Sequence, residues 1–146
     1  MIKRTGAAVW NGGLKDGKGS LTTGSKTLNQ TPYSFNTRFE DGQGTNPEEL
    51  IAAAHARCFS MALSLKLSEM GMKPERIETS ATAPLEKTDA GMAVTTIHLD
   101  LTADVPNADP GKFDEAARLT KDNCIISRLL NAKITLDAKL RSGSRA

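Results

Sequence analysis

The chain has 146 residues and a mass of 15.6 kDa, which is enough for one domain with a proper hydrophobic core. Its 19 basic and 17 acidic side chains leave a net charge of only +2, and aromatic residues make up 4% of the sequence. So small a charge, with so few side chains on which bases could stack, argues against nucleic acid as a partner. Residues 1–6 lack the apolar run of a secretory leader, and we expect no stretch to approach a membrane span. We therefore expect a cytoplasmic protein.

The first 45 residues divide into a meander and a loop. Residues 1–30 contain short alternating runs punctuated by glycines, which predict a small antiparallel meander. Its strands are expected near 3–11, 17–23 and 26–30, with Trp10 on the inner face. Residues 31–45 have no regular period and contain Pro and Gly breakers, so we interpret them as irregular. A loop of this length in a compact domain is usually functional.

Residues 46–72 predict a long central helix. Asn46 is a good N-cap, Pro47 suits the first helical position, and Glu49 can complete a capping box. Nothing breaks the pattern before Gly71, which gives about 24 helical residues, or roughly 36 Å. The helix is apolar on several sides and needs more cover than the short strands of one chain readily give. We therefore infer a partner subunit, with helix ends that simply project into solvent as the alternative.

Cys58, one of only two cysteines, lies in the middle of this helix. The helical period places it in a stripe that we expect to be buried. The expected members of the stripe are Ile51, Ala54, Cys58, Met61, Ala62 and Leu65. In an arbitrary chain such a cysteine is usually a small hydrophobe that fills core space. His55 lies near the same face and could donate to a thiolate, although a packed or half-exposed histidine is more common.

Residues 75–140 are expected to complete the domain. Two segments with period two, 77–83 and 93–103, predict a hairpin joined around 87–91.

A second helix is expected near 110–122, because Asp109-Pro110 is a helix start. Its apolar side should contain Phe113, Ala116, Ala117 and Thr120. Cys124 follows at the helix end or at the start of a further turn, and residues 133–140 alternate as a last strand. The inventory predicts a single α+β domain over 1–146, with helices packed on antiparallel sheet.

Two thiols suggest a redox cycle. A thiolate can attack a peroxide and become a sulfenic acid, which a second thiol condenses into a disulfide. The attacking cysteine then needs a nearby cation. Arg57 adjoins Cys58 in sequence but diverges from it by about 100° around the helix. Arg38, in the loop, is the better candidate, since a guanidinium stays charged and could hold both thiolate and hydroperoxide.

A carboxylate would be needed to fix that arginine. Glu49 is committed to the helix cap, whereas Glu48 is free. Glu48 precedes Cys58 by ten residues, or about 15 Å along a straight helix. Either the helix bends after its first turns, or Glu48 serves the site of a second subunit.

No metal site is expected, because the two histidines lie far apart and no CxxC or HExxH spacing is present.

Four motifs connect these residues to a known family. They are Pro32-Tyr33, Phe35-Asn36-Thr37-Arg38-Phe39-Glu40, Gly44-Thr45-Asn46-Pro47-Glu48-Glu49-Leu50-Ile51, and Ala53-Ala54-His55-Ala56 continued by Cys58-Phe59-Ser60-Met61-Ala62-Leu63. In them the sequence resembles the OsmC/Ohr family of bacterial thiol-dependent peroxidases, over nearly the whole chain. The leading segment resembles the OsmC (osmotically inducible) branch.

The resemblance implies an intertwined homodimer, with two long central helices wrapped by sheets and two sites at the subunit interface. It implies that Cys58 is the peroxidatic and Cys124 the resolving cysteine, with Arg38 and Glu48 completing the site. The implied substrates are organic hydroperoxides, reduced to alcohols, with hydrogen peroxide poorer. Dithiols, including lipoyl groups, would supply the electrons, and no metal or organic cofactor is implied. A role in oxidative or osmotic stress follows from the family.

Two departures from the family pattern concern disulfide formation. Arg57 stands where a small residue usually precedes the peroxidatic cysteine, and Ile125 stands where proline usually follows the second.

Phe35, Phe39 and Met61 are candidates for an apolar substrate pocket, with ordinary core as the alternative. Two other readings stay open: a non-catalytic redox sensor or small-molecule-binding dimer, and a structural dimer with inert thiols.

Overall fold

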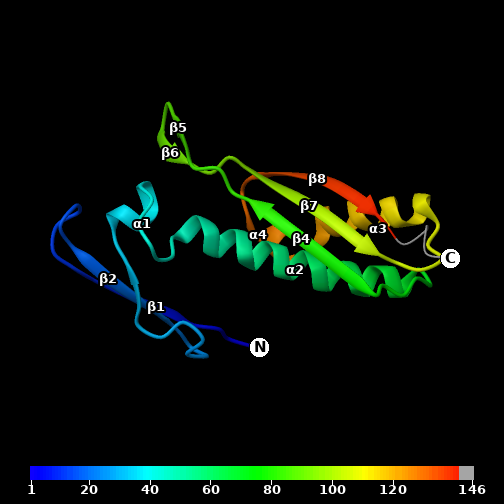
Figure 1. Cartoon of the computed structure of the whole chain (residues 1–146), viewed down its shortest axis with the longest axis horizontal. Helices are drawn as coiled ribbons and strands as arrows, with labels where there is room; N and C mark the ends of the chain where they lie inside the picture. The colour runs from blue at the N-terminus through cyan, green and yellow to red at the C-terminus, as the bar shows by residue number, and fades with distance from the viewer. Residues whose placement is uncertain (142–146) are drawn as a thin grey trace. The chain divides into compact units, whose positions relative to one another are not determined.

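The structure is a computed structural model that describes residues 1–141 (Figure 1). It has the expected α+β composition, with a long helix and several sheets. By its internal contacts the chain forms two compact units, of which the first is Met1–Leu50 and the second begins at Ile51.

The first unit contains the expected antiparallel meander. Its strands, paired in the order β1-β2-β3, are β1 (Gly6–Asn11), β2 (Lys18–Thr23) and β3 (Thr31–Tyr33). The third strand was predicted at 26–30, which is wrong. Lys26 and Gln30 have positive φ angles of 65° and 52°, so this segment turns instead of extending.

The segment predicted as irregular contains β3 and a short helix, α1 (Phe35–Phe39). The helix start closes on itself, since Ser34 N–H donates to Thr37 Oγ1 at 2.9 Å and that hydroxyl donates to the Ser34 carbonyl at 2.8 Å. Trp10 is 36% exposed, with its ring centroid 5.5 Å from that of Tyr33. It therefore packs against a neighbouring aromatic ring and keeps part of its surface open.

The long helix α2 (Pro47–Glu69) begins and ends as predicted. The Asn46 side-chain oxygen accepts an N–H of the first turn at 2.8 Å. At the other end Gly71 has a φ of +79°, and Met72 N–H donates to the Leu67 carbonyl at 2.8 Å. This is the Schellman closure that a left-handed glycine permits.

The buried stripe of α2 differs from the predicted one. It consists of His55, Phe59, Leu63 and Leu67, all without exposed surface. Cys58 is half-buried at the border of this stripe, whereas Met61 and Leu65 are 69% and 63% exposed. The prediction was wrong because a helix that is apolar on several sides has no single hydrophobic face for its period to identify.

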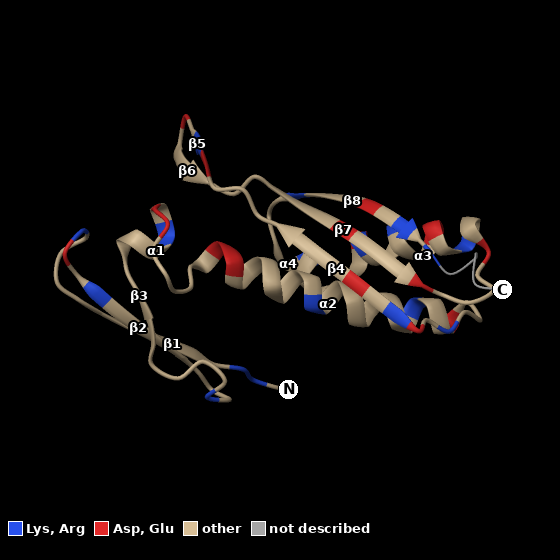
Figure 2. Cartoon of the chain, viewed as in Figure 1, with Lys and Arg blue, Asp and Glu red and all other residues tan. Residues whose placement is uncertain are grey.

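The expectation that no stretch approaches a membrane span is also corrected. By length and composition, α2 is apolar enough to cross a membrane, with a mean hydropathy of 1.3. Two of its three acidic residues, Glu48 and Glu49, lie in the first turn, where Figure 2 shows red at the start of a mostly tan helix. A helix that buries one face in a protein core passes the same test, and α2 buries Phe59 and Leu63 in this way.

The second unit is built on a three-stranded sheet in the order β4-β7-β8. Its elements after α2 are β4 (Arg76–Thr82), β5 (Glu86–Thr88), β6 (Gly91–Ala93), β7 (Thr96–Asp104), α3 (Pro110–Asn123), α4 (Ile125–Leu129) and β8 (Lys133–Leu140). The predicted pairing of 77–83 with 93–103 is confirmed as the antiparallel pair β4–β7. The connection between these strands forms a small hairpin of its own, β5–β6.

The sheet is mixed and not wholly antiparallel, because β8 runs parallel to β7. This corrects the sequence expectation. Parallel neighbours need a long crossover, and α3 with α4 provides it between the two strands (Figure 1).

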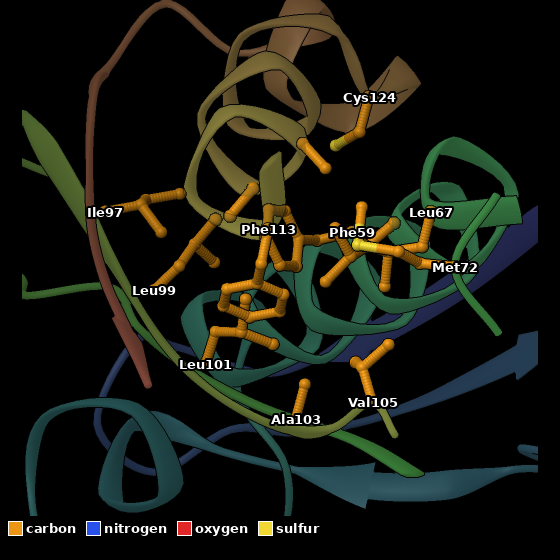
Figure 3. Close-up of a cluster of buried hydrophobic side chains, with 13 residues drawn as sticks. Phe59, Leu67, Met72, Ile97, Leu99, Leu101, Ala103, Val105, Phe113 and Cys124 are labelled. Carbon is orange, nitrogen blue, oxygen red and sulfur yellow. The ribbon is translucent and has the colours of Figure 1, made fainter. Parts of the chain in front are cut away.

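The core of this unit lies between the sheet and the helices (Figure 3). One face of β7 contributes Ile97, Leu99, Leu101 and Ala103, which meet Phe59, Leu63 and Leu67 of α2. The expected apolar side of α3 is confirmed, since Phe113, Ala116, Ala117 and Thr120 are all buried. Cys124 belongs to the same buried cluster and Cys58 packs against it.

Candidate active site

Arg38 and Glu48 form an ion pair within the first unit. Arg38 donates from Nε at 3.1 Å and from Nη2 at 2.9 Å, both to Oε1 of Glu48. The carboxylate is only 12% exposed, whereas the guanidinium is 44% exposed. The guanidinium is thus fixed in orientation while part of it stays open to a ligand.

Apolar rings surround this arginine. The Phe39 ring centroid lies 5.2 Å from Cζ of Arg38, and the Phe35 ring lies 4.9 Å from that of Phe39. Together with Trp10 and Leu14, these side chains line a cavity of about 200 Å³. A mostly apolar cavity with one guanidinium in its wall suits a ligand with a hydrocarbon body and a polar head.

The two cysteines lie in the second unit, and neither is in a disulfide. Cys58 is half-buried on α2, and Cys124 is only 3% exposed. Cys124 also lines a cavity of about 260 Å³ between α2 and α3, to which Leu65 and Thr120 contribute. Both thiols therefore adjoin one core, Cys58 from α2 and Cys124 from the end of α3.

Cys124 occupies the junction of two helices. It is the C-cap of α3, where its N–H donates to the Thr120 carbonyl at 3.0 Å, and also the N-cap of α4. In the second role its Sγ accepts the N–H of Ser127 at 3.4 Å and lies 3.1 Å from the Ser127 hydroxyl oxygen. The sequence interpretation, a helix end or the start of a further turn, is correct in both senses.

His55 reaches this junction from α2. Its Nε2 lies 2.7 Å from Oγ of Ser127, and its ring has no exposed surface. Within residues 1–141, Nδ1 of His55 has no hydrogen-bond partner. Burial lowers the pKa of His55 below its ordinary value of 6.5. Of the two roles expected from the sequence, the packed histidine is therefore confirmed and the half-exposed one is wrong, whereas the bond to Ser127 was not foreseen.

The sequence-predicted residues thus fall into two groups. Arg38, Glu48, Phe35 and Phe39 come together in the first unit, and Cys58 and Cys124 adjoin one core in the second. Met61 belongs to the second unit, where its side chain is exposed. Ser127 was missed, because its contact with His55 spans 72 residues and depends on the turn that Cys124 begins.

A further polar group lies on β7 and β8. His98, Asp100 and Asp137 each offer a ligand atom within 4.8 Å of the others, and Thr135 Oγ1 is 2.6 Å from Nδ1 of His98. The sequence spacing gave no sign of it, because the parallel register that sets Asp100 opposite Asp137 joins distant segments. Exposed acidic groups of this kind are common where no ion is bound.

Comparison with known proteins assigns the fold and the family. The family model described as OsmC-like protein matches residues 40–139, which is more than half of the chain. The chain belongs to the OsmC family. Within that family it is 52% identical, over 141 residues, to the peroxiredoxin OsmC of Escherichia coli strain K12, covering 97% of this chain and 99% of the relative.

More distant OsmC relatives share the architecture. The organic hydroperoxide resistance protein OhrB of Bacillus subtilis is 25% identical over 124 residues, covering 84% of this chain and 89% of OhrB. An OsmC-like protein of unknown function from Vibrio cholerae superposes with a TM-score of 0.74 at 15% identity, covering 94% of this chain and 99% of that one. The crystal structure of OhrB gives 0.63 at 24% identity, with coverage of 94% and 98%. These superpositions confirm the fold.

Proposed function

We propose that this protein is a thiol-dependent peroxidase that reduces organic hydroperoxides to alcohols, and hydrogen peroxide more weakly. Membership of the OsmC family and 52% identity to a protein named peroxiredoxin OsmC support the reaction class. The similarity to an organic hydroperoxide resistance protein supports the substrate class. The observation that carries the proposal is the placement of two unpaired thiols, Cys58 and Cys124, against one buried cluster.

In the proposed first step, the Cys58 thiolate attacks the hydroperoxide. The O–O bond breaks, the alcohol leaves after taking up a proton, and Cys58 is oxidised to a sulfenic acid. Arg38 holds the hydroperoxide and the developing charge, and Glu48 fixes the guanidinium through the two hydrogen bonds to its Oε1. The cavity beside Arg38, lined by Phe35 and Phe39, accommodates the alkyl part of the substrate.

In the proposed second step, Cys124 condenses with the sulfenic acid to give a disulfide and water. An external dithiol, such as a lipoyl group, reduces the disulfide and completes the cycle. No prosthetic group takes part, because sulfur undergoes every change of oxidation state. We place this cycle in the cytoplasm, as a response to oxidative or osmotic stress.

We further propose a homodimer with its sites where the subunits meet. Glu48 and Cys58 lie on the same helix, ten residues and about 15 Å apart by helical rise. In the proposed dimer, the Arg38–Glu48 pair of one subunit therefore serves Cys58 of the other.

Stoichiometric oxidation tests the chemistry. One equivalent of cumene hydroperoxide is added to the reduced protein, free thiols are counted, and peptides are mapped by mass spectrometry. We expect two thiols to disappear and a Cys58–Cys124 peptide to form, and we expect Cys124→Ser to accumulate a sulfenic acid at Cys58 that dimedone labels. Two unreacted thiols after this treatment would contradict the peroxidase, and the redox-sensor or inert-thiol reading would replace it.

Complementation tests the shared site. Cys58→Ser and Glu48→Gln subunits, each inactive alone, are mixed under conditions that exchange subunits. Half of the dimers are then mixed, and each mixed dimer has one intact site, so about one quarter of the wild-type activity should return. A site within one chain would give no recovery.

A further inference from the structure

The contacts around Cys124 form a continuous chain of hydrogen-bonding groups. Sγ of Cys124 lies 3.1 Å from Oγ of Ser127, and that oxygen lies 2.7 Å from Nε2 of His55. All three side chains are buried. Two short contacts through one hydroxyl, among buried side chains, are an arrangement in which a proton can move between a thiol and an imidazole.

From this geometry we infer that Ser127 and His55 form a proton relay that serves Cys124 when the disulfide closes and when it is reduced. The inference rests on the proposed function, because it assigns Cys124 to the second step. Ser127 contacts the reacting sulfur and is a catalytic residue in this step. His55 acts through Ser127 and is a positioning residue that receives the proton.

The Cys124 thiol gives its proton to Ser127, whose own hydroxyl proton passes to Nε2 of His55. The sulfur attacks the Cys58 sulfenic acid, so that an S–S bond forms and the S–O bond breaks. Cys124 sulfur is oxidised and Cys58 sulfur is reduced; the hydroxide that leaves takes a proton from solvent and becomes water. While the disulfide is closed, His55 releases this proton to solvent. On reduction by a dithiol, Cys124 leaves as a thiolate, which takes up a proton through Ser127.

The surroundings of His55 favour a transient proton over a permanent charge. Burial lowers the pKa of its imidazole, so the ring rests neutral and Nε2 can accept. Two charged residues adjoin the relay in sequence, Arg57 on α2 and Arg128 on α4. Both are exposed. With Nε2 as acceptor, Nδ1 carries the hydrogen and has no partner among residues 1–141 that would stabilise the imidazolium.

A structural role for the same contacts makes a different prediction. If the bond between His55 and Ser127 only ties α2 to α4, a glutamine at position 55 can preserve it, because its amide reaches a similar distance and hydrogen-bonds to a hydroxyl. Glutamine cannot accept a proton at working pH. His55→Gln therefore distinguishes a proton relay from a hydrogen bond that only holds α2 to α4.

The experiment measures two rates in the same samples of the full-length protein. Reduced protein is mixed rapidly with one equivalent of cumene hydroperoxide; consumption of peroxide reports the step at Cys58, and loss of alkylatable Cys124 reports disulfide closure. In His55→Gln and Ser127→Ala, we expect the rate of closure relative to peroxide consumption to fall at least about tenfold. Ser127→Thr, which retains the hydroxyl, should recover most of this loss. His98→Gln, which alters the other histidine, should match the wild type.

The pH profile supplies a readout that a structural role would not move. In the wild type, closure should slow as pH falls through the lowered pKa of His55 and reach a plateau above it. In His55→Gln, the rate should rise with pH across the range, because hydroxide must then remove the thiol proton. Thermal melting of each variant verifies that it is folded.

The relay would be overturned if disulfide closure in His55→Gln kept the wild-type rate and the wild-type pH profile. It would also be overturned if closure slowed in Ser127→Ala but not in His55→Gln, because the hydroxyl would then act without His55. Failure of the proposed function looks different, because the wild-type protein would then consume no peroxide at Cys58.

Discussion

Arg38 is held by a single oxygen of Glu48, and this geometry makes the identity of the cation important. Nε and Nη2 both donate to Oε1, so the orientation of the guanidinium depends on its fork. A lysine retains the charge but has no fixed pair of donors.

We therefore expect Arg38→Lys to lower kcat/KM for cumene hydroperoxide about tenfold or more. Arg57→Lys is the matched control, because Arg57 adjoins Cys58 in sequence yet its side chain is exposed. It should keep nearly full activity. Equal losses in both variants would mean that Arg57, and not only Arg38, acts on the thiolate.

His55 also makes stability depend on pH. Its pKa in the folded protein lies below the ordinary value of 6.5, so the unfolded chain binds a proton more readily than the folded one. This makes the free energy of unfolding fall as pH drops below about 6.5, until the pH reaches the lowered pKa of the folded state.

Thermal melting between pH 7.5 and 5.5 measures this effect. The wild-type Tm should drop over this interval, and His55→Gln should reduce the drop. His98→Gln is the control for the second histidine. If the drop is the same in the wild type and in His55→Gln, then folding does not lower the pKa of His55.

Some of the candidate site residues could be proposed from sequence because their chemistry is local or rests on motifs. Cys58 and Cys124 are the only thiols, and Arg38 and Glu48 fall in the motifs shared with the family. Ser127 could not be recognised in this way. A serine in a short turn has no sequence pattern that marks it as a site residue. Its candidate role depends on its contact with the imidazole of His55, which lies 72 residues away in the sequence.

At the scale of the element, the end of α2 depends on one glycine. Gly71 has a φ of +79°, and a Cβ added there would meet no atom within 4 Å. A substitution is therefore penalised by the backbone conformation and not by a clash.

We expect Gly71→Ala to lower the free energy of unfolding by about 1 kcal/mol, measured by urea denaturation. Gly6→Ala is the matched control, since Gly6 also has open space around its Cβ position but no left-handed φ. It should be neutral or slightly stabilising. If both substitutions lowered the free energy of unfolding equally, the loss could not be assigned to the left-handed φ of Gly71.

Element boundaries followed the strength of their local signals. Caps, glycine and proline located α2 and α3 to within a few residues, because each signal acts on its own backbone. The parallel pairing of β7 with β8 could not be predicted from alternation, which is the same in parallel and antiparallel strands. Nor could the buried stripe of α2, since its period is blurred by apolar residues on every side.

At the scale of the whole molecule, the second unit exposes large apolar side chains. They include Met61 and Leu65 on α2 and Ile125 and Leu129 on α4. Exposed apolar side chains grouped on two helices are typical of a protein that associates, and they support the proposed homodimer.

We expect Leu65→Glu to shift the protein from dimer to monomer in sedimentation velocity, because an unpaired carboxylate would have to be buried in the interface. Met92→Glu, which changes an exposed methionine on the β5–β6 hairpin, is the control and should remain dimeric. A wild-type protein that sediments as a monomer would contradict the dimer itself, and with it the shared site.

The two roles of Cys124 have one more consequence. Its sulfur is both the atom that enters the proposed disulfide and the acceptor that caps α4 through Ser127 N–H. A disulfide sulfur is drawn toward its partner and is a poorer acceptor, so closing the bond loosens the first turn of α4. By thermodynamic reciprocity, whatever holds α4 in place opposes oxidation, and whatever frays it favours oxidation. The stability of this short helix thereby sets part of the reduction potential of the disulfide. The exchange rates of the amide protons of Ile125–Leu129 then report whether the protein is oxidised or reduced and ready for the next peroxide.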